Sequence, residues 1–266
     1  ISIKSALLVI DVQYDFVNGS LAVNDANAII PIINDLHKSD LFELVAFSQD
    51  WHCAEHVSFA SSHSADTTGP ALSPDDPRPP PFTSTCNLTY TQQGELCGYQ
   101  KKYPSNGANC EHEDPTRLIK SYQRLWPDHC IENSFGARIV DEILINKERD
   151  IIIKKGTNCH IDSYSAFFDN NRLSQTQLHE NFLDAGITDV YVVGLAFDYC
   201  VFYSAMDART LNYTVYVVKD AIKGIEEHGI RYATRKMQKH GIHLINSSQL
   251  LSPSKKSDAP NHTDDL

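Results

Sequence analysis

Three features are missing from this 266-residue sequence, and each absence excludes a class of function. No apolar run approaches the roughly 18 residues that a membrane-spanning helix needs, so we expect no membrane span. Lys and Arg number 23 against 34 Asp and Glu, and a net charge of −11 argues against nucleic acid or an anionic membrane as partner. No G-x-G-x-x-G or Walker sequence follows a predicted strand, which argues against a dinucleotide or nucleoside triphosphate.

Apolar stretches alternate between two periodicities along the chain. Short β-branched runs predict strands at 6–12, 44–48, 150–154, 189–195, 214–218 and 243–245. Helical spacing predicts helices at 27–36, 136–144, 174–185 (capped by Ser174) and 230–239, with another that begins at or near Cys200. This alternation indicates an α/β fold, a doubly wound, mostly parallel six-stranded sheet with helices on both faces.

The composition divides the chain into a core and two additions. Residues 61–117 are rich in Ser, Thr, Pro, Gly and Asp, and predict an irregular insertion in one domain that spans 1–251. Residues 252–266 are polar and charged, and predict a disordered tail. The chain begins at Ile1 rather than Met, which fits a processed mature chain or a sequence trimmed at its start.

Cysteines and glycosylation sequons favour a secreted protein over a cytoplasmic one. If Cys200 is reactive, six cysteines remain for disulfides: Cys53, Cys86, Cys97, Cys110, Cys130 and Cys159. Chance predicts about two sequons, and five are present, at Asn18, Asn87, Asn212, Asn246 and Asn261. A cytoplasmic enzyme with scattered thiols is the alternative, and the sequence does not say which sequons carry glycan.

Chemically active side chains follow the predicted strands. Asp11, Asp50, Lys155 and Cys200 all lie just past a predicted strand, with His52 two residues beyond Asp50. Ligands of doubly wound sheets bind beyond the carboxyl ends of the strands, so we expect these groups to converge at one edge. An ammonium lowers the pKa of a nearby thiol, and a carboxylate can accept its proton, so Cys200 is a candidate nucleophile. Taken singly, a cysteine is more often a small buried residue and an aspartate a turn residue.

The segment Asp50-x-His52 also carries metal-capable side chains, and His129 could complete a zinc-type set with open positions for water or substrate. The third ligand is remote in sequence, so spacing alone leaves a chance arrangement open. We expect Glu55 and His56 to support the ligands rather than bind metal. Zinc fits this donor set, and iron or manganese could occupy it too.

Seven segments resemble nicotinamidases, which belong to the isochorismatase-like cysteine hydrolases. The resemblance covers residues 5–60 and 118–250 and rests on DVQYDF (11–16), SQDWH (48–52), HVSFA (56–60), WPDHC (126–130), KGTN (155–158), DSYSAFF (162–168) and GLAFDYCV (194–201). It implies Asp11, Lys155 and Cys200 as catalytic residues, and Asp50, His52 and His129 as ligands of one divalent metal ion. It also implies a cis peptide at Leu195–Ala196, with the N–H groups of Ala196 and Cys200 forming an oxyanion hole. The substrate pocket would contain Phe16, Trp126, Tyr164, Leu195 and Tyr199.

The implied reaction is hydrolysis of nicotinamide to nicotinate and ammonia through a thioester on Cys200, with pyrazinamide as an analogue. Alternatives are an amidase of the same superfamily acting on a carbamoyl or ureido substrate, and a secreted, non-catalytic metal-binding homologue. A homo-oligomer is left open.

Cys53 and Cys159 stand where the family commonly has proline, and we expect them to form a disulfide. Cys86 and Cys97 are the expected local pair, and Cys110 would bond Cys130 by elimination. A free Cys130 thiol is the alternative.

Overall fold

A six-stranded parallel sheet forms the centre of the molecule, as predicted. The computed structural model describes residues 3–63, 85–97, 110 and 114–251. The strands lie in the order β5-β2-β1-β6-β7-β8, and every neighbouring pair is parallel. Their bounds are β1 (Ser5–Ile10), β2 (Leu44–Asp50), β5 (Ile151–Lys155), β6 (Asp189–Gly194), β7 (Thr214–Ile222) and β8 (His243–Ile245).

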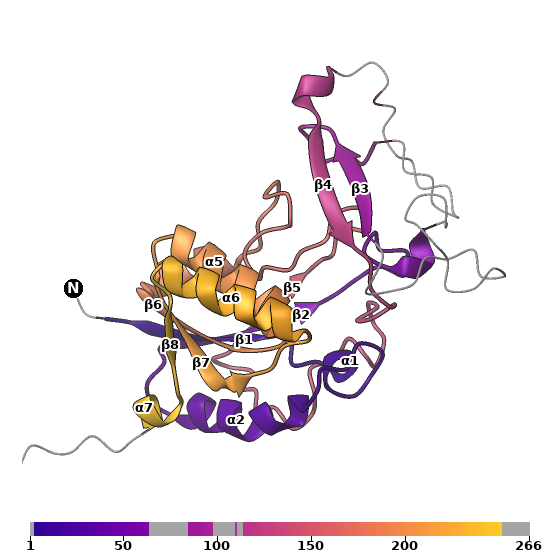
Figure 1. Cartoon of the computed structure of the whole chain (residues 1–266). Helices are drawn as coiled ribbons and strands as arrows, with labels where there is room; N and C mark the ends of the chain where they lie inside the picture. The colour runs from indigo at the N-terminus through magenta and orange to yellow at the C-terminus, as the bar shows by residue number, and fades with distance from the viewer. Residues whose placement is uncertain (1–2, 64–84, 98–109, 111–113, 252–266) are drawn as a thin grey trace, which may run out of the picture.

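Helices cover both faces of this sheet (Figure 1). Leu7 and Val9 of β1 pack in one core with α2 (Ile30–Lys38), which continues the 3-10 turn η1 (Ala26–Ile29). Leu8 and Ile10 point to the other core, with α4 (Leu178–Ala185), α5 (Phe202–Thr210) and α6 (Glu227–Lys239). Successive side chains of a strand alternate between faces, so an uninterrupted apolar strand builds both cores.

Two expectations about helices were wrong. Residues 136–144 form turns, because the Ala137 carbonyl accepts hydrogen bonds from the side chains of Gln13 (2.8 Å), in the loop after β1, and Gln49 (2.6 Å), near the end of β2. Ser174 does not cap α4, since its N–H and hydroxyl both donate to the Asp169 carboxylate. The predicted end of α4 is confirmed, with Gly186 in the left-handed conformation at φ 71°.

Part of the predicted insertion is regular. Thr85–Tyr90 forms β3, which pairs antiparallel with β4 (Ile119–Arg124), and this two-stranded ribbon stands apart from the central sheet (Figure 1). Short 3-10 turns, η2 (Ala60–Ser62) and η3 (Pro115–Arg117), lie near the ends of the 61–117 stretch. Leu88 and Tyr90 of β3 pack with Val57, Leu125 and others in a third core. Because these two residues lie two positions apart on the strand, one face of β3 is buried, and this packing stabilises the ribbon.

The sequence did not predict the short helices α1 (Tyr14–Val17) and α7 (Ser248–Leu251). The remaining insertion residues and the tail predicted at 252–266 lie outside the described residues. Within those described, none of the helices is long and apolar enough to cross a membrane.

The structure contains the expected Cys53–Cys159 disulfide, but the other two predicted pairs were wrong. Cys97 bonds Cys110 instead, 13 residues along the chain. Cys130 is a buried free thiol in the core that contains α2, and its backbone N–H donates to the Asp15 carboxylate at 2.7 Å. The Cys86 side chain lies outside the described residues.

Candidate active site

The turn after β6 carries Cys200. Gly194 ends the strand at φ 109°, where a Cβ atom would lie 2.1 Å from the Ile10 carbonyl oxygen, so glycine permits β1 and β6 to approach. The Leu195–Ala196 peptide is cis, as expected. A π-helix, η4 (Phe197–Val201), leads into α5, so the helix expected to begin at or near Cys200 is present and its first turn is a π-helix. Cys200 therefore lies inside a helical turn, one turn beyond the first helical residue.

Lys155 joins the side chains that follow neighbouring strands. Its Nζ lies 2.9 Å from Asp11 Oδ2, 2.6 Å from Asp50 Oδ1 and 3.5 Å from Cys200 Sγ. It also donates to the Ser163 carbonyl oxygen at 3.0 Å. The register of β2 with β5 places Asp50 directly opposite Lys155, while Asp11 follows the last residue of β1. The predicted convergence is therefore present, with Lys155 only 2% exposed.

Burial and charge compete in this group. Burial would lower the pKa of Lys155, but the carboxylates of Asp11 and Asp50 raise it well above its ordinary value. Burial raises the pKa of Asp11, and the Lys155 ammonium offsets this only in part. Burial also raises the pKa of the Cys200 thiol despite the nearby ammonium. These directions favour a neutral thiol beside a carboxylate that readily takes up a proton, rather than a resident thiolate.

Asp11 is held for such an exchange. Its Oδ1 accepts a hydrogen bond from the Ser48 hydroxyl at 2.6 Å, which fixes the carboxylate. Its Oδ2 faces Lys155 in an ion pair but makes no hydrogen bond of good geometry within the described residues. One reactive atom from each of Asp11, Asp50 and Cys200 lies within 4.8 Å of the others. The Asp11 carboxylate therefore lies beside the thiol, and its hydrogen bond contributes to the raised pKa of Cys200.

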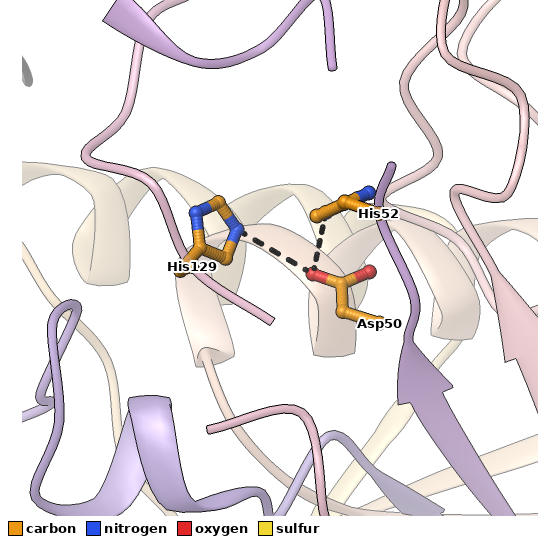
Figure 2. A group of neighbouring side chains, drawn as sticks. All are labelled: Asp50, His52 and His129. Carbon is orange, nitrogen blue, oxygen red and sulfur yellow. Dashed lines mark ion pairs between the residues drawn. The ribbon is translucent and has the colours of Figure 1, made fainter. Parts of the chain in front are cut away.

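Asp50, His52 and His129 form a candidate metal centre (Figure 2). Asp50 Oδ2 lies 3.4 Å from His52 Nε2 and 3.7 Å from His129 Nε2. Each histidine turns its Nδ1 toward a backbone carbonyl oxygen, that of Gly156 at 2.9 Å for His52 and that of Pro127 at 2.7 Å for His129. A carbonyl can only accept, so it selects the tautomer protonated on Nδ1 and leaves both Nε2 lone pairs for a cation. The donor set therefore fits one divalent metal ion.

His56 packs against His52 beside this centre. Its ring stacks on His52 at 4.0 Å between centroids, and its Nδ1 lies 2.7 Å from the Ser58 hydroxyl. With His52 and Asp162, it forms a second cluster of metal-capable groups. Glu55 belongs to neither cluster. The stacking is consistent with the expected support of His52.

An aromatic cavity is lined by Cys200 and by two residues of the candidate metal centre. Four of the predicted pocket residues line it: Phe16, Trp126, Tyr164 and Tyr199. Asp50, His129, Ala196 and Cys200 line it as well. Trp126 meets Tyr199 edge-on at 4.7 Å, and its indole N–H donates to the Tyr164 hydroxyl at 3.2 Å. These aromatic side chains offer faces and edges for contact with a flat ring, in a cavity that is lined by the thiol as well as by two of the metal donors.

Leu195 was wrongly expected in this pocket, because its side chain is fully buried in the core and does not line the cavity. Sequence reasoning missed Leu21, Asp162 and Ile225, which do line it. Asp162 and Ile225 lie in the segments that follow β5 and β7. The rule that ligands bind beyond the carboxyl ends of parallel strands, which identified Asp50 and Lys155, could therefore have identified them too. No comparable signal marks Leu21.

Comparisons with known proteins agree with this geometry. Residues 109–249 match the isochorismatase domain family. The chain is 32% identical to the nicotinamidase of Acinetobacter baylyi over 92% of this chain and 94% of that protein. It is also similar to a solved Acinetobacter baumanii nicotinamidase/pyrazinamidase at 34% identity and TM-score 0.70, covering 94% and 99% of the two chains.

A more distant likeness bears on the candidate metal centre. The pyrazinamidase of Pyrococcus horikoshii, solved in complex with zinc, is 26% identical with TM-score 0.62, over 91% of this chain and 99% of that one. From the family match and these relatives, the chain belongs to the isochorismatase domain family, on its nicotinamidase-like branch, and is a hydrolase of amide C–N bonds.

Proposed function

We propose that this protein hydrolyses nicotinamide to nicotinate and ammonia through a thioester on Cys200. The observation that carries the proposal is one aromatic cavity that is lined both by Cys200 and by the donors Asp50 and His129. A pyridine carboxamide is a flat ring with a ring nitrogen for a metal and an amide for the thiol, so it matches the chemistry of this lining. The relatives described above are nicotinamidases, which supports this substrate.

The residues divide the reaction into two halves. Asp11 Oδ2 takes the thiol proton as Cys200 Sγ attacks the carboxamide carbon, and the N–H groups of Ala196 and Cys200 stabilise the oxyanion. Asp11 then passes that proton to the departing amine, which leaves as ammonia, and a thioester remains. Water next gives a proton to Asp11 and adds to the thioester carbon. Collapse breaks the C–S bond, Asp11 returns its proton to Cys200, and the acid leaves as nicotinate after giving its own proton to ammonia or solvent. Lys155 keeps Asp11 oriented and balances negative charge throughout.

Asp50, His52 and His129 would hold one divalent metal ion, and the zinc in the Pyrococcus relative supports zinc as that ion. Iron or manganese could use the same oxygen and nitrogen donors. A bound ion would supply positive charge that orients the ring nitrogen of the substrate, directly or through water. The aromatic side chains Phe16 and Trp126 would exclude other solvent from the ring.

Ammonia release from nicotinamide tests the proposal. Wild type should turn over, while Cys200→Ala should lose at least about a thousandfold in kcat and still bind nicotinate. Cys130→Ala is the matched control, because Cys130 is the other free thiol among the described residues and does not line the cavity. Turnover retained by Cys200→Ala would refute the thioester route. Wild type that binds zinc without turnover would favour a non-catalytic metal-binding homologue, and turnover of carbamoyl or ureido compounds alone would favour the other amidases.

We also propose that the chain is secreted and glycosylated. Three sequon asparagines, Asn18, Asn212 and Asn246, are exposed, and two disulfides are present, which supports an oxidising compartment. Protein purified from its native source should lose mass on treatment with an N-glycosidase. An unchanged mass together with reduced thiols would place it in the cytoplasm instead.

A further inference from the structure

Arg124, the last residue of β4, reaches from the ribbon to the rim of the aromatic cavity. Its Nη1 donates to the Tyr199 hydroxyl at 2.7 Å, and its Nη2 pairs with Glu226 at 2.5 Å. The guanidinium carbon lies 5.1 Å from the Trp126 ring centroid and 5.7 Å from that of Tyr199. One side chain therefore contacts two aromatic walls of the cavity and an acidic residue beside a third wall residue, Ile225.

These contacts connect three separate parts of the chain. Trp126 follows β4, Tyr199 lies in the π-helix that carries Cys200, and Glu226 precedes α6. The link from the π-helix to α6 is reinforced by Asp198, whose carboxylate accepts the N–H groups of Ile225 and Glu226 at 2.9 Å each. The guanidinium connects the ribbon to both of these by charge-assisted hydrogen bonds, in addition to the edge-on contact of Trp126 with Tyr199.

The chemistry of the contact requires arginine. A guanidinium can donate from two nitrogens in one plane while its face lies over a ring, and an ammonium cannot do all three at once. Arg124 Nε is shielded from solvent and has no hydrogen-bond partner within the described residues. Burying part of a guanidinium in this way carries a cost, so its contacts with Tyr199 and Glu226 must offset it.

We propose that Arg124 is a positioning residue that holds Tyr199 and Trp126 in place before a flat substrate ring enters, and so sets the KM for nicotinamide. The inference rests on the proposed function. An aromatic side chain of the cavity that becomes ordered only on binding loses conformational entropy, and this loss weakens affinity. A side chain that is already ordered in the free protein does not incur this loss. Arg124 does not line the cavity, and it acts through the Tyr199 hydroxyl and the Trp126 face.

Steady-state kinetics of Arg124→Gln, Tyr199→Phe and the double variant test the proposal. Arg124→Gln should raise KM for nicotinamide about tenfold and leave kcat within about twofold. Tyr199→Phe keeps the ring but loses the hydroxyl, so it should also raise KM, by no more than Arg124→Gln does. Because both changes break the Arg124–Tyr199 contact, the double variant should be little worse than Arg124→Gln alone. Arg124→Lys should recover only part of the loss.

A second readout is independent of turnover. The chain has two tryptophans, so in a Trp51→Phe background the fluorescence of Trp126 alone reports nicotinate binding. Arg124→Gln should weaken that binding by about the factor seen in KM. Arg138→Gln is the matched control, because Arg138 also lies over two rings, Tyr14 and Phe135, and none of these three residues lines the cavity. It should leave both readouts unchanged.

An unchanged KM in Arg124→Gln, or a lower kcat and thermal stability at constant KM, would overturn the proposal and leave the proposed function standing. Multiplying effects of Arg124→Gln and Tyr199→Phe would also overturn it, since independent residues are additive in free energy. If Arg124→Gln fails to fold, Tyr199→Phe alone must still raise KM. A wild type that neither turns over nicotinamide nor binds nicotinate would remove the proposed function, and this inference with it.

Discussion

Replacing Lys155 with methionine tests the charge balance of the site. Methionine has similar length but no charge, so it removes the ion pairs at 2.9 Å to Asp11 and 2.6 Å to Asp50 and leaves two buried carboxylates. Breaking a buried ion pair by removing one partner costs about 3–5 kcal/mol. For a chain of this size, each kcal/mol corresponds to about 2–4 °C in Tm, so we expect Tm to fall by about 6–20 °C.

The loss should depend on pH. Burial raises the pKa of Asp11, and Lys155 opposes this, so without the ammonium that pKa rises further. A carboxyl whose folded pKa exceeds its unfolded pKa, about 3.9, contributes stability that is fully present below the unfolded value. This stability disappears as pH rises through the folded pKa. Lys155→Met should therefore be closer to wild type at pH 5 than at pH 8, and adding Asp11→Asn should restore part of the stability but no activity, because Asp50 remains unpaired.

Urea unfolding at pH 5 and pH 8 measures these differences. A chelator should be present, because an ion at Asp50 would supply the positive charge that the variant lacks. Lys154→Met is the matched control: Lys154 is exposed on the same strand, with its ammonium 3.5 Å from the Trp51 ring centroid, and its loss should cost at most about 1 kcal/mol. Equal stability of Lys155→Met and wild type at pH 8, or equal losses in the two variants, would refute the reasoning.

Three further predictions concern the disulfide, the base and the metal. Cys53→Ser with Cys159→Ser opens a bridge across a separation of 106 residues and should lower the unfolding free energy by about 2–5 kcal/mol in urea, whereas an unchanged midpoint would contradict a structural role. Since burial raises the pKa of Asp11, kcat/KM should fall on its acid side above the ordinary 3.8, and Asp11→Asn should lose about 10²–10⁴ in kcat, unless another group is the base. His129→Ala should lose bound metal by elemental analysis and melt at lower temperature, and full metal retention would exclude it as a ligand.

Sequence reasoning worked best where the signal is local. Uninterrupted β-branched runs predicted all six strands of the central sheet, because a strand buried on both faces must be apolar throughout. The same pattern put Asp11, Asp50, Lys155 and Cys200 at strand ends, and the parallel topology brought them together. The aromatic residues came from the resemblance instead, since no periodicity marks them, and spacing alone left His129 open as a ligand.

Local signals failed where distant groups competed for the backbone. Residues 136–144 have helical spacing, yet Gln13 and Gln49 take the Ala137 carbonyl. Ser174 is a typical N-cap, yet Asp169 binds its N–H and hydroxyl. A propensity is worth less than a satisfied buried hydrogen bond, so tertiary contacts prevailed.

The sequence by itself determined the class of fold, the order of strands and helices along the chain, and the edge of the sheet at which chemistry takes place. Tertiary structure alone decided which atoms meet there: Lys155 between two carboxylates, Cys97 bonded to Cys110, and Arg124 against Tyr199. The physical reason is range. Periodicity and turn chemistry act over a few residues, while ion pairs, disulfides and cavity walls depend on distances across the folded chain that no local pattern encodes.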